Sequence, residues 1–290
     1  MIRSIFLNIV LFVSMSVYVF CGILLIPFSE NVVYEYWFCF SRMFRFIVKH
    51  IGGIDFKIEN EQYLKTQGRV IFASRHESMW ETIAFISLFS RPVFVMKKEL
   101  HDIPVFGWLA DKVHSIFVDR EHGLKALIDV SRQISAALDD GRQVIIFPEG
   151  TRMPVGEFVP LKRGISLFYG KNNCSIVPII HNSGKFWARR SFKKNPGTIT
   201  VKVMKPIAPG LSQDEFMNRL NNIFQTEVAK FGESNITRDS ETEQSSETND
   251  TWDSKTEQSS EANDAWDSET EQSSVANGTR HSKTTKLEKK

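Results

Sequence analysis

The central part of the chain, residues 53–232, alternates short apolar runs with longer segments of helical periodicity. The short runs are rich in Val, Ile and Phe and have the length of single strands in a buried sheet. We expect strands near 69–74, 92–97, 115–119, 143–147, 175–180 and 198–204. Helical patterns cover 78–90, 122–139, 162–170 and 213–231. This alternation predicts an α/β fold in which a mixed sheet is flanked by helices.

The N-terminal segment has a different pattern. Residues 4–26 contain no charged side chain, and the run is long enough to cross a bilayer core of about 30 Å. It is longer than a usual signal-peptide core and lacks a clear cleavage site, so we expect it to be retained. Residues 32–51 mix large aromatic residues with basic ones, which suits the headgroup region, although a core helix has the same composition. Residues 1–52 are therefore predicted to form a membrane-associated helical hairpin, which either spans the bilayer or dips into one leaflet.

The C-terminal segment, residues 233–290, is repetitive. Its 14-residue unit occurs at 239–252, 253–266 and 267–280. Each unit offers at most one large apolar residue, so it cannot bury enough surface to offset the entropy of an ordered chain. We predict a disordered acidic tail that follows a catalytic domain at 53–232.

The charge and the cysteine content limit the possible binding partners and the cellular compartment. The tail holds 14 acidic and 7 basic residues, a net charge of −7, whereas residues 1–232 have a net charge of +9. A basic body suits an anionic membrane or a phosphorylated substrate, and no nucleic-acid-binding motif accompanies it. The three cysteines, Cys21, Cys39 and Cys174, are odd in number and widely spaced, which favours a reducing compartment.

The first candidate motif is HESMWE at 76–81. On one helix, positions five apart point about 140° away from each other. His76 and Glu81 can therefore pair only if His76 precedes the helix and folds back over its first turn. Ser78 is a good N-cap, and Ser78 with Glu81 also forms a capping box. The alternatives are thus a catalytic pair, in which Glu81 raises the basicity of His76, or an ordinary helix cap beside a surface histidine.

The second candidate motif is FPEGTR at 147–152, directly after the most apolar strand. Its turn presents polar side chains beyond the strand end, and the Arg152 guanidinium offers donors that match phosphate oxygens. A plain polar turn is the alternative. The candidate substrate-binding residues of this block are Glu149, Gly150, Thr151 and Arg152.

Basic residues recur at other strand ends. Arg120 ends FVDR, Lys97 and Lys98 follow VFVM, and Lys162 comes shortly after FPEGTR. Each residue alone is weak evidence for a binding site, but together they predict that cations converge on one side of the sheet. The stretch 181–194 adds basic and aromatic residues that suit anionic lipid or an acidic acyl carrier protein, unless it is a solvated loop.

Four blocks, HESMWE, FVDR, FPEGTR and IVPI (176–179), occur in the order found in the glycerolipid acyltransferase family. The chain most resembles bacterial 1-acyl-glycerol-3-phosphate acyltransferases over roughly residues 53–210. The resemblance implies an integral or peripheral membrane enzyme of phospholipid biosynthesis. We expect it at the inner membrane with its catalytic domain on the cytoplasmic side, although the charges around residues 4–26 do not fix the orientation. The resemblance also implies acyl transfer from an acyl carrier protein or coenzyme A thioester to the sn-2 hydroxyl of lysophosphatidate, without a metal or other cofactor.

By the same resemblance, His76 is the general base and Glu81 its carboxylate partner. Glu149 and Arg152 bind the glycerol phosphate, assisted by Arg120 and by Lys97 or Lys98, with Lys162 a weaker candidate. The family's first block usually ends in Asp, whereas this chain has Glu81, which is one methylene longer.

Three alternatives remain open at this stage. The acceptor could be glycerol 3-phosphate or another lysophospholipid, because the motifs recognise a shared phosphate and hydroxyl. The protein could be an inactive relative that binds lipid. A metal hydrolase fits less well, because one motif histidine with scattered carboxylates has poor ligand spacing.

Overall fold

The computed structural model describes residues 1–119 and 123–243, with side chains through residue 232. The described residues contain a seven-stranded sheet of order β1-β7-β6-β2-β5-β3-β4. Neighbouring strands are parallel except β6 and β7, which are antiparallel. The strands are β1 (Ile54–Glu59), β2 (Val70–Ser74), β3 (Pro92–Lys97), β4 (Ile116–Val118), β5 (Gln143–Ile146), β6 (Ser175–His181) and β7 (Gly197–Val203).

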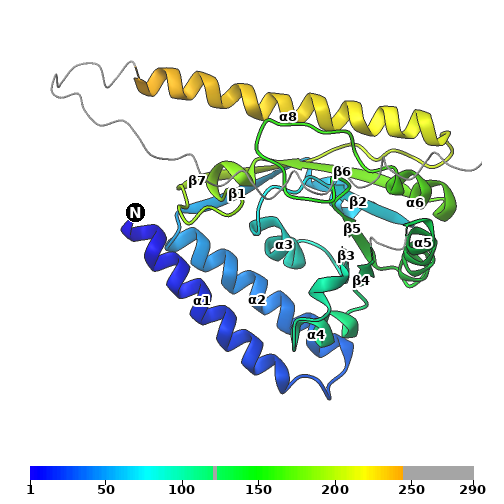
Figure 1. Cartoon of the computed structure of the whole chain (residues 1–290), viewed down its shortest axis with the longest axis horizontal. Helices are drawn as coiled ribbons and strands as arrows, with labels where there is room; N and C mark the ends of the chain where they lie inside the picture. The colour runs from blue at the N-terminus through cyan, green and yellow to red at the C-terminus, as the bar shows by residue number, and fades with distance from the viewer. Residues whose placement is uncertain (120–122, 244–290) are drawn as a thin grey trace, which may run out of the picture. The chain divides into compact units, whose positions relative to one another are not determined.

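Helices cover both faces of this sheet (Figure 1). One face packs against α5 (Gly123–Asp139), α6 (Gly164–Asn172) and α8 (Gln213–Glu243). The other face packs against α2 (Glu30–His50) and the short α3 (Trp80–Ala84). The mixed sheet flanked by helices confirms the predicted fold class.

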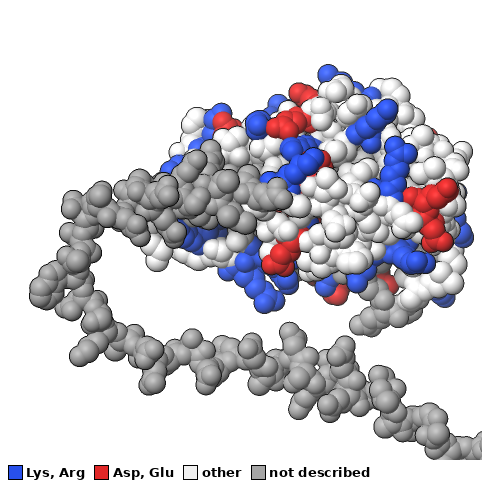
Figure 2. Space-filling model, turned by 90° about the horizontal axis from the view of Figure 1, so that it is seen from above, with Lys and Arg blue, Asp and Glu red and all other residues white. Residues whose placement is uncertain are grey.

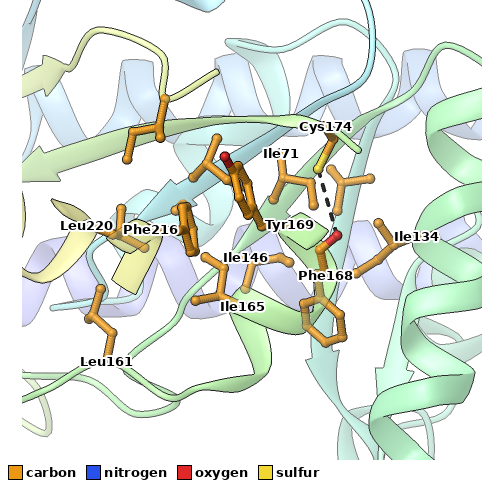
Figure 3. Close-up of a cluster of buried hydrophobic side chains, with 14 of the residues drawn as sticks. Ile71, Ile134, Ile146, Leu161, Ile165, Phe168, Tyr169, Cys174, Phe216 and Leu220 are labelled. Atoms are coloured by element: carbon orange, nitrogen blue, oxygen red, sulfur yellow. Dashed lines mark hydrogen bonds between the residues drawn. The ribbon is translucent and has the colours of Figure 1, made fainter. Parts of the chain in front are cut away.

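The two-residue repeat of strand β2 explains how both faces are covered. Ile71 and Ala73 point to the layer of α5, α6 and α8, where they join the cluster shown in Figure 3. Val70 and Phe72 point to the opposite layer with α2 and α3. Successive side chains of a strand alternate between faces, and all five residues of β2 are buried, so β2 lies at the centre of the molecule.

The N-terminal helices form a hairpin beside the sheet. Helix α1 (Ile2–Ile23) is long and apolar enough to cross a membrane, and little of it is buried. Its exposed side chains include Phe6, Phe12 and Phe20. Both of its ends contact the rest of the protein: Ser4 bonds to Lys194 near one end, and Gly22 packs closely against Leu109 of α4 (Phe106–Lys112) at the other.

Several elements differ from the sequence-based expectations. Strand β1 and helices α4 and α7 (Ser183–Phe186) were not predicted, because β1 is an edge strand with charged positions and the helices are short. The helix expected over 78–90 is α3 followed by a 3₁₀ turn at Phe85–Ser87. Helix α8 continues to Glu243, whereas the apolar pattern predicted a helix only as far as residue 231. The predicted repeats lie outside the described residues.

The side chain of Phe224 tests the α8 layer, because it is fully buried in the cluster that α8 forms with the sheet. We expect Phe224→Ala to lower the free energy of unfolding by about 3–5 kcal/mol, through lost apolar burial and the cavity left behind. Chemical denaturation in detergent measures this change. Arg219→Ala, at an exposed position of the same helix, should change it by less than about 0.5 kcal/mol. Equal effects of both variants would contradict this packing.

Candidate active site

The candidate site lies where β2, β5 and β6 end side by side. These three strands are parallel neighbours, so the chain leaves all of them at the same edge of the sheet. His76 follows β2, Glu149 follows β5 and Ser183 follows β6. In open α/β sheets this edge is the usual position of a ligand site.

His76 and Glu81 form the pair that their spacing allowed. The Nδ1 atom of His76 lies 2.8 Å from Oε1 of Glu81, and its ring stacks on Phe147 with centroids 4.4 Å apart. Glu81 is fully buried, whereas the His76 side chain is 16% exposed. Among the described residues, Nε2 of His76 has no hydrogen-bond partner. The imidazole therefore has one nitrogen held by a carboxylate and the other available to a substrate.

Glu81 also bonds to the backbone directly before α3, so the contacts expected of a histidine partner and of a helix cap occur together. Its Oε1 accepts the backbone N–H groups of Glu77 and Ser78, at 2.9 and 2.8 Å. Its Oε2 accepts the hydroxyls of Ser78 and Ser183, each at 2.8 Å. Ser78 in turn accepts the N–H of Trp80. One carboxylate thus orients the histidine and joins α3 to α7.

Arg75 is a fully buried cation directly before the histidine. Its Nε donates to Glu77 at 2.6 Å and its Nη1 donates to Glu149 at 2.7 Å. Its Nη2 donates to the carbonyl oxygens of Pro154 and Glu157, at 2.5 and 2.7 Å. The guanidinium therefore joins the loop after β2 to the loop after β5.

Glu149 is turned into the protein. It is 2% exposed, and its two carboxylate oxygens accept Nη1 of Arg75 and the backbone N–H of His76. These bonds place Glu149 beneath the His76 loop. Its predicted contact with substrate stays a prediction.

Behind this loop, His181 at the end of β6 completes a buried polar cluster. Its Nε2 donates to the carbonyl oxygen of Arg75 at 2.8 Å, and its Nδ1 faces the N–H of Ser183 at 3.4 Å. Burial lowers the pKa of His181 to about 4, so it is neutral at neutral pH. Glu77 accepts the N–H of Gly184 at 2.9 Å.

The three buried glutamates of this cluster differ in their pKa values. Burial raises the pKa of Glu77 to about 8 and that of Glu149 to about 7, and it outweighs the opposite effect of the Arg75 guanidinium on both. Burial also acts to raise the pKa of Glu81, but His181, the bond to His76 and the Ser78 N–H outweigh it and lower this pKa to about 2. Glu81 is therefore ionised at neutral pH and can stabilise a protonated His76.

The predicted cations are spread more widely. Arg152 is partly exposed and lines a cavity of about 300 Å³ beside Met79. Lys98 donates to Asp119 at 2.8 Å and lines a different cavity. Lys97 and Lys162 are exposed. Arg120 lies outside the described residues, so the predicted convergence of cations stays a prediction for these positions.

The rest of the FPEGTR block forms the expected turn. Gly150 has φ +74°, which favours glycine, and its N–H donates to the carbonyl oxygen of Phe147 at 3.0 Å. Thr151 is exposed. The N–H of Met153 donates to the carbonyl oxygen of His76 at 2.7 Å, so the block is fastened to the histidine loop.

Sequence reasoning missed four polar members of the cluster, which are Arg75, Glu77, His181 and Ser183. Arg75, Glu77 and Ser183 follow the ends of apolar strands, as do the residues that were found, and His181 is the last residue of β6. That position was the available signal, but charged residues after a strand are usually solvated. Within residues 1–119 and 123–243, no group of three or more His, Cys, Asp or Glu side chains is arranged to hold a metal ion.

Comparisons with known proteins show the family of the chain. The family model described as Acyltransferase matches residues 55–182. The chain is 34% identical over 176 residues to the 1-acyl-sn-glycerol-3-phosphate acyltransferase of Pseudomonas aeruginosa, covering 57% of this chain and 68% of that relative. It is 32% identical over 165 residues to the enzyme of that name from Limnanthes douglasii, covering 56% and 57%.

The fold agrees as well. The crystal structure of PlsC, the 1-acyl-sn-glycerophosphate acyltransferase of Thermotoga maritima, matches with a TM-score of 0.66 at 18% identity, covering 79% of this chain and 96% of that one. The sequence similarity, together with the shared fold, thus defines an acyltransferase. The chain belongs to the glycerolipid acyltransferase family.

The buried glutamates predict a pH dependence of stability. In the folded protein the pKa values of Glu77 and Glu149, about 8 and 7, lie above the ordinary 4.5. The stabilisation that comes from protonating these carboxyl groups in the folded state is therefore lost as the pH rises toward 8. His181 and Glu81 have lowered pKa values in the folded protein. The contribution of His181 to stability is complete above pH 6.5, and that of Glu81 is complete above pH 4.5. The free energy of unfolding should therefore fall from pH 6.5 to 8, by up to about 1.4 kcal/mol per pH unit for each carboxyl group, and then level off.

Chemical denaturation of the full chain in detergent across this pH range measures the fall. Glu77→Gln should reduce it, whereas Glu99→Gln, at an exposed carboxylate, should leave it as in the wild type. A wild-type stability that rises or stays constant from pH 6.5 to 8 would contradict the raised pKa values.

Proposed function

We propose that this protein transfers a fatty acyl group from a thioester to the sn-2 hydroxyl of 1-acyl-glycerol-3-phosphate, which yields phosphatidate for phospholipid synthesis. The observation that carries the proposal is the held imidazole: Nδ1 of His76 bonds to buried, ionised Glu81, while Nε2 has no partner among the described residues. Membership of the family and the names of the relatives support the choice of substrate.

The proposed chemistry follows from this arrangement. Nε2 of His76 takes the proton of the acceptor hydroxyl, and the hydroxyl oxygen attacks the thioester carbonyl carbon. The tetrahedral intermediate collapses with loss of the thiolate, which takes the proton back from His76. Glu81 fixes the tautomer and stabilises the imidazolium between the two steps. The step balances without a covalent enzyme intermediate, a metal or another cofactor.

The nature of the acceptor is supported by the position of α1. Its polar residue Asn8 and the site residues Met79 and Arg152 line one cavity. An exposed apolar helix beside the site favours an acceptor that resides in a membrane over soluble glycerol 3-phosphate. The donor is an acyl thioester of coenzyme A or of acyl carrier protein.

We further propose that the hairpin enters a single leaflet of the inner membrane from the cytoplasmic side. Helix α1 is attached to the catalytic domain at both ends, through Ser4 and through Gly22, so its ends belong on the same side. The exposed apolar side chains of α1 form the surface that enters the leaflet. The face seen from above in Figure 2, away from α1 and α2, carries interspersed basic and acidic side chains, as suits a solvated surface.

Removal of the proposed base tests the chemistry. We expect His76→Ala to lower kcat for acyl transfer to lysophosphatidate by about 10²- to 10⁴-fold, because no other group is held to take the proton. The assay uses purified protein in mixed micelles with an acyl-coenzyme A donor, and products are identified by mass. His50→Ala, which removes an exposed histidine of α2, should keep full activity. A folded His76→Ala protein with undiminished transfer would refute the proposal.

Cysteine labelling tests the single-leaflet topology. In a chain with Cys21 and Cys39 replaced by serine, Ile2→Cys and Phe28→Cys place thiols near the two ends of α1. We expect a membrane-impermeant maleimide to label both positions in inside-out vesicles and neither in right-side-out vesicles. Retained activity confirms that the variants are native. Labelling of the two positions from opposite sides would show that α1 spans the membrane.

A further inference from the structure

The cavity beside the His76 loop is lined by cations from two distant parts of the chain. Its volume is about 300 Å³. Arg152 of the FPEGTR block lies on one side, and the turn after α7 supplies Arg189 and Arg190. The other lining residues are Asn8, Met79, Trp187, Ala188, Ser191, Phe192 and Lys194, so the described lining contains no carboxylate.

The three arginines, of which Arg189 and Arg190 are exposed, are unpaired within the part of the chain that the structure describes. Among the described residues, no side chain or carbonyl oxygen accepts a hydrogen bond from the guanidinium of Arg152, Arg189 or Arg190, and none forms an ion pair with them. Like charges that converge without an acidic partner repel one another, and an anion relieves this repulsion. Guanidinium groups match the oxygens of a phosphate in particular.

The turn that presents Arg189 and Arg190 is held in place. The N–H of Ser191 donates to Ala188 at 3.2 Å, and Arg190 between them has φ +57°, a strained value for a residue other than glycine. Such strain persists only where the surroundings fix the backbone. Here the ammonium of Lys194 bonds to the carbonyl oxygens of Ser191 and Phe192, and it lies 4.9 Å from the Trp187 ring.

Helix α1 holds the same turn from the other side. Nδ2 of Asn8 donates to the carbonyl oxygen of Phe192 at 2.9 Å. Ser4 donates to the carbonyl oxygen of Lys194 at 3.2 Å and accepts its N–H at 3.0 Å. The cationic turn is therefore fixed between the apolar helix and the catalytic loop.

We propose that Arg189 and Arg190, together with Arg152, bind the phosphate monoester of the acceptor and select it over phosphodiester lysophospholipids. This inference rests on the function proposed above. A monoester carries a charge of about −1.5 to −2 at neutral pH, whereas a diester carries about −1. Each guanidinium attracts the more highly charged monoester more strongly than the diester, so the additional arginines favour the monoester.

The position of the cavity favours the acceptor over the donor as its occupant. We place the acyl chain of the lysophospholipid along α1, which contributes Asn8 to the lining of the cavity. Met79 borders the same cavity and is close in sequence to His76, so the acceptor hydroxyl lies toward the base. The phosphate-containing arm of the donor is the alternative that the experiment must separate.

The test compares two acceptors in mixed micelles: lysophosphatidate and lysophosphatidylglycerol with the same acyl chain. We expect the double variant Arg189→Gln/Arg190→Gln to lower kcat/KM for lysophosphatidate by about tenfold or more, the loss of at least one charge-assisted hydrogen bond. The value for lysophosphatidylglycerol should change far less, so the selectivity falls. Lys193→Gln removes an exposed cation of the same segment that does not line the cavity, and it should leave the selectivity unchanged.

The outcomes separate this inference from the proposed function. If the wild type acylates lysophosphatidate and the double variant keeps its selectivity, the inference is wrong and the function stands. A higher KM for acyl-coenzyme A with an unchanged KM for the acceptor would assign the cavity to the donor and overturn the inference. If the wild type does not acylate lysophosphatidate, both fail. If the wild type does not acylate the diester, the KM for lysophosphatidate tests the inference alone: a raised KM in the double variant supports it, and an unchanged KM contradicts it.

Discussion

The site depends on one buried cation. Arg75 has no exposed surface, and its guanidinium donates to two carboxylates and two carbonyl oxygens from the loops after β2 and β5. Removing one partner of such a buried network leaves a buried polar group without its hydrogen bond, which typically costs about 1–3 kcal/mol. His76 is its neighbour in the chain, and the N–H of His76 bonds to Glu149, which Arg75 also holds. The position of the proposed base is thus a consequence of where this cation is buried.

The length of Glu81 has a physical reason in this arrangement. Its Oε1 reaches His76 and two backbone N–H groups, while its Oε2 reaches the hydroxyls of Ser78 and Ser183. Ser183 begins α7, which follows a different strand from the one that precedes His76. The additional methylene, relative to the Asp usual in the family, suits a carboxylate that bridges these two segments. Orientation of the histidine and capping of the helix start are therefore one interaction.

Most of the sheet could be predicted, because buried strands such as β2 and β5 are continuous apolar runs. Strand β1 could not, since it is an edge strand with alternating charges whose pairing with β7 depends on a distant part of the chain. The same limit applies to the site. His76 and Glu81 were predictable because their spacing and a local cap bring them together. Arg75 was not, because its burial depends on Glu149 and on Pro154, which are far away in sequence.

The hairpin and the site are also physically one unit. Ser4 and Asn8 are polar residues of the mostly apolar helix α1, and they bond to Lys194 and Phe192 directly after the turn that carries Arg189 and Arg190. A shift of α1 relative to the catalytic domain must therefore break these bonds or move the turn. Arg152 on the opposite side of the cavity is fastened to His76 through Met153. The position of Arg189 and Arg190 relative to the base consequently depends on how α1 packs, so the helix that we propose to enter the membrane also helps to determine where a bound phosphate lies relative to Nε2.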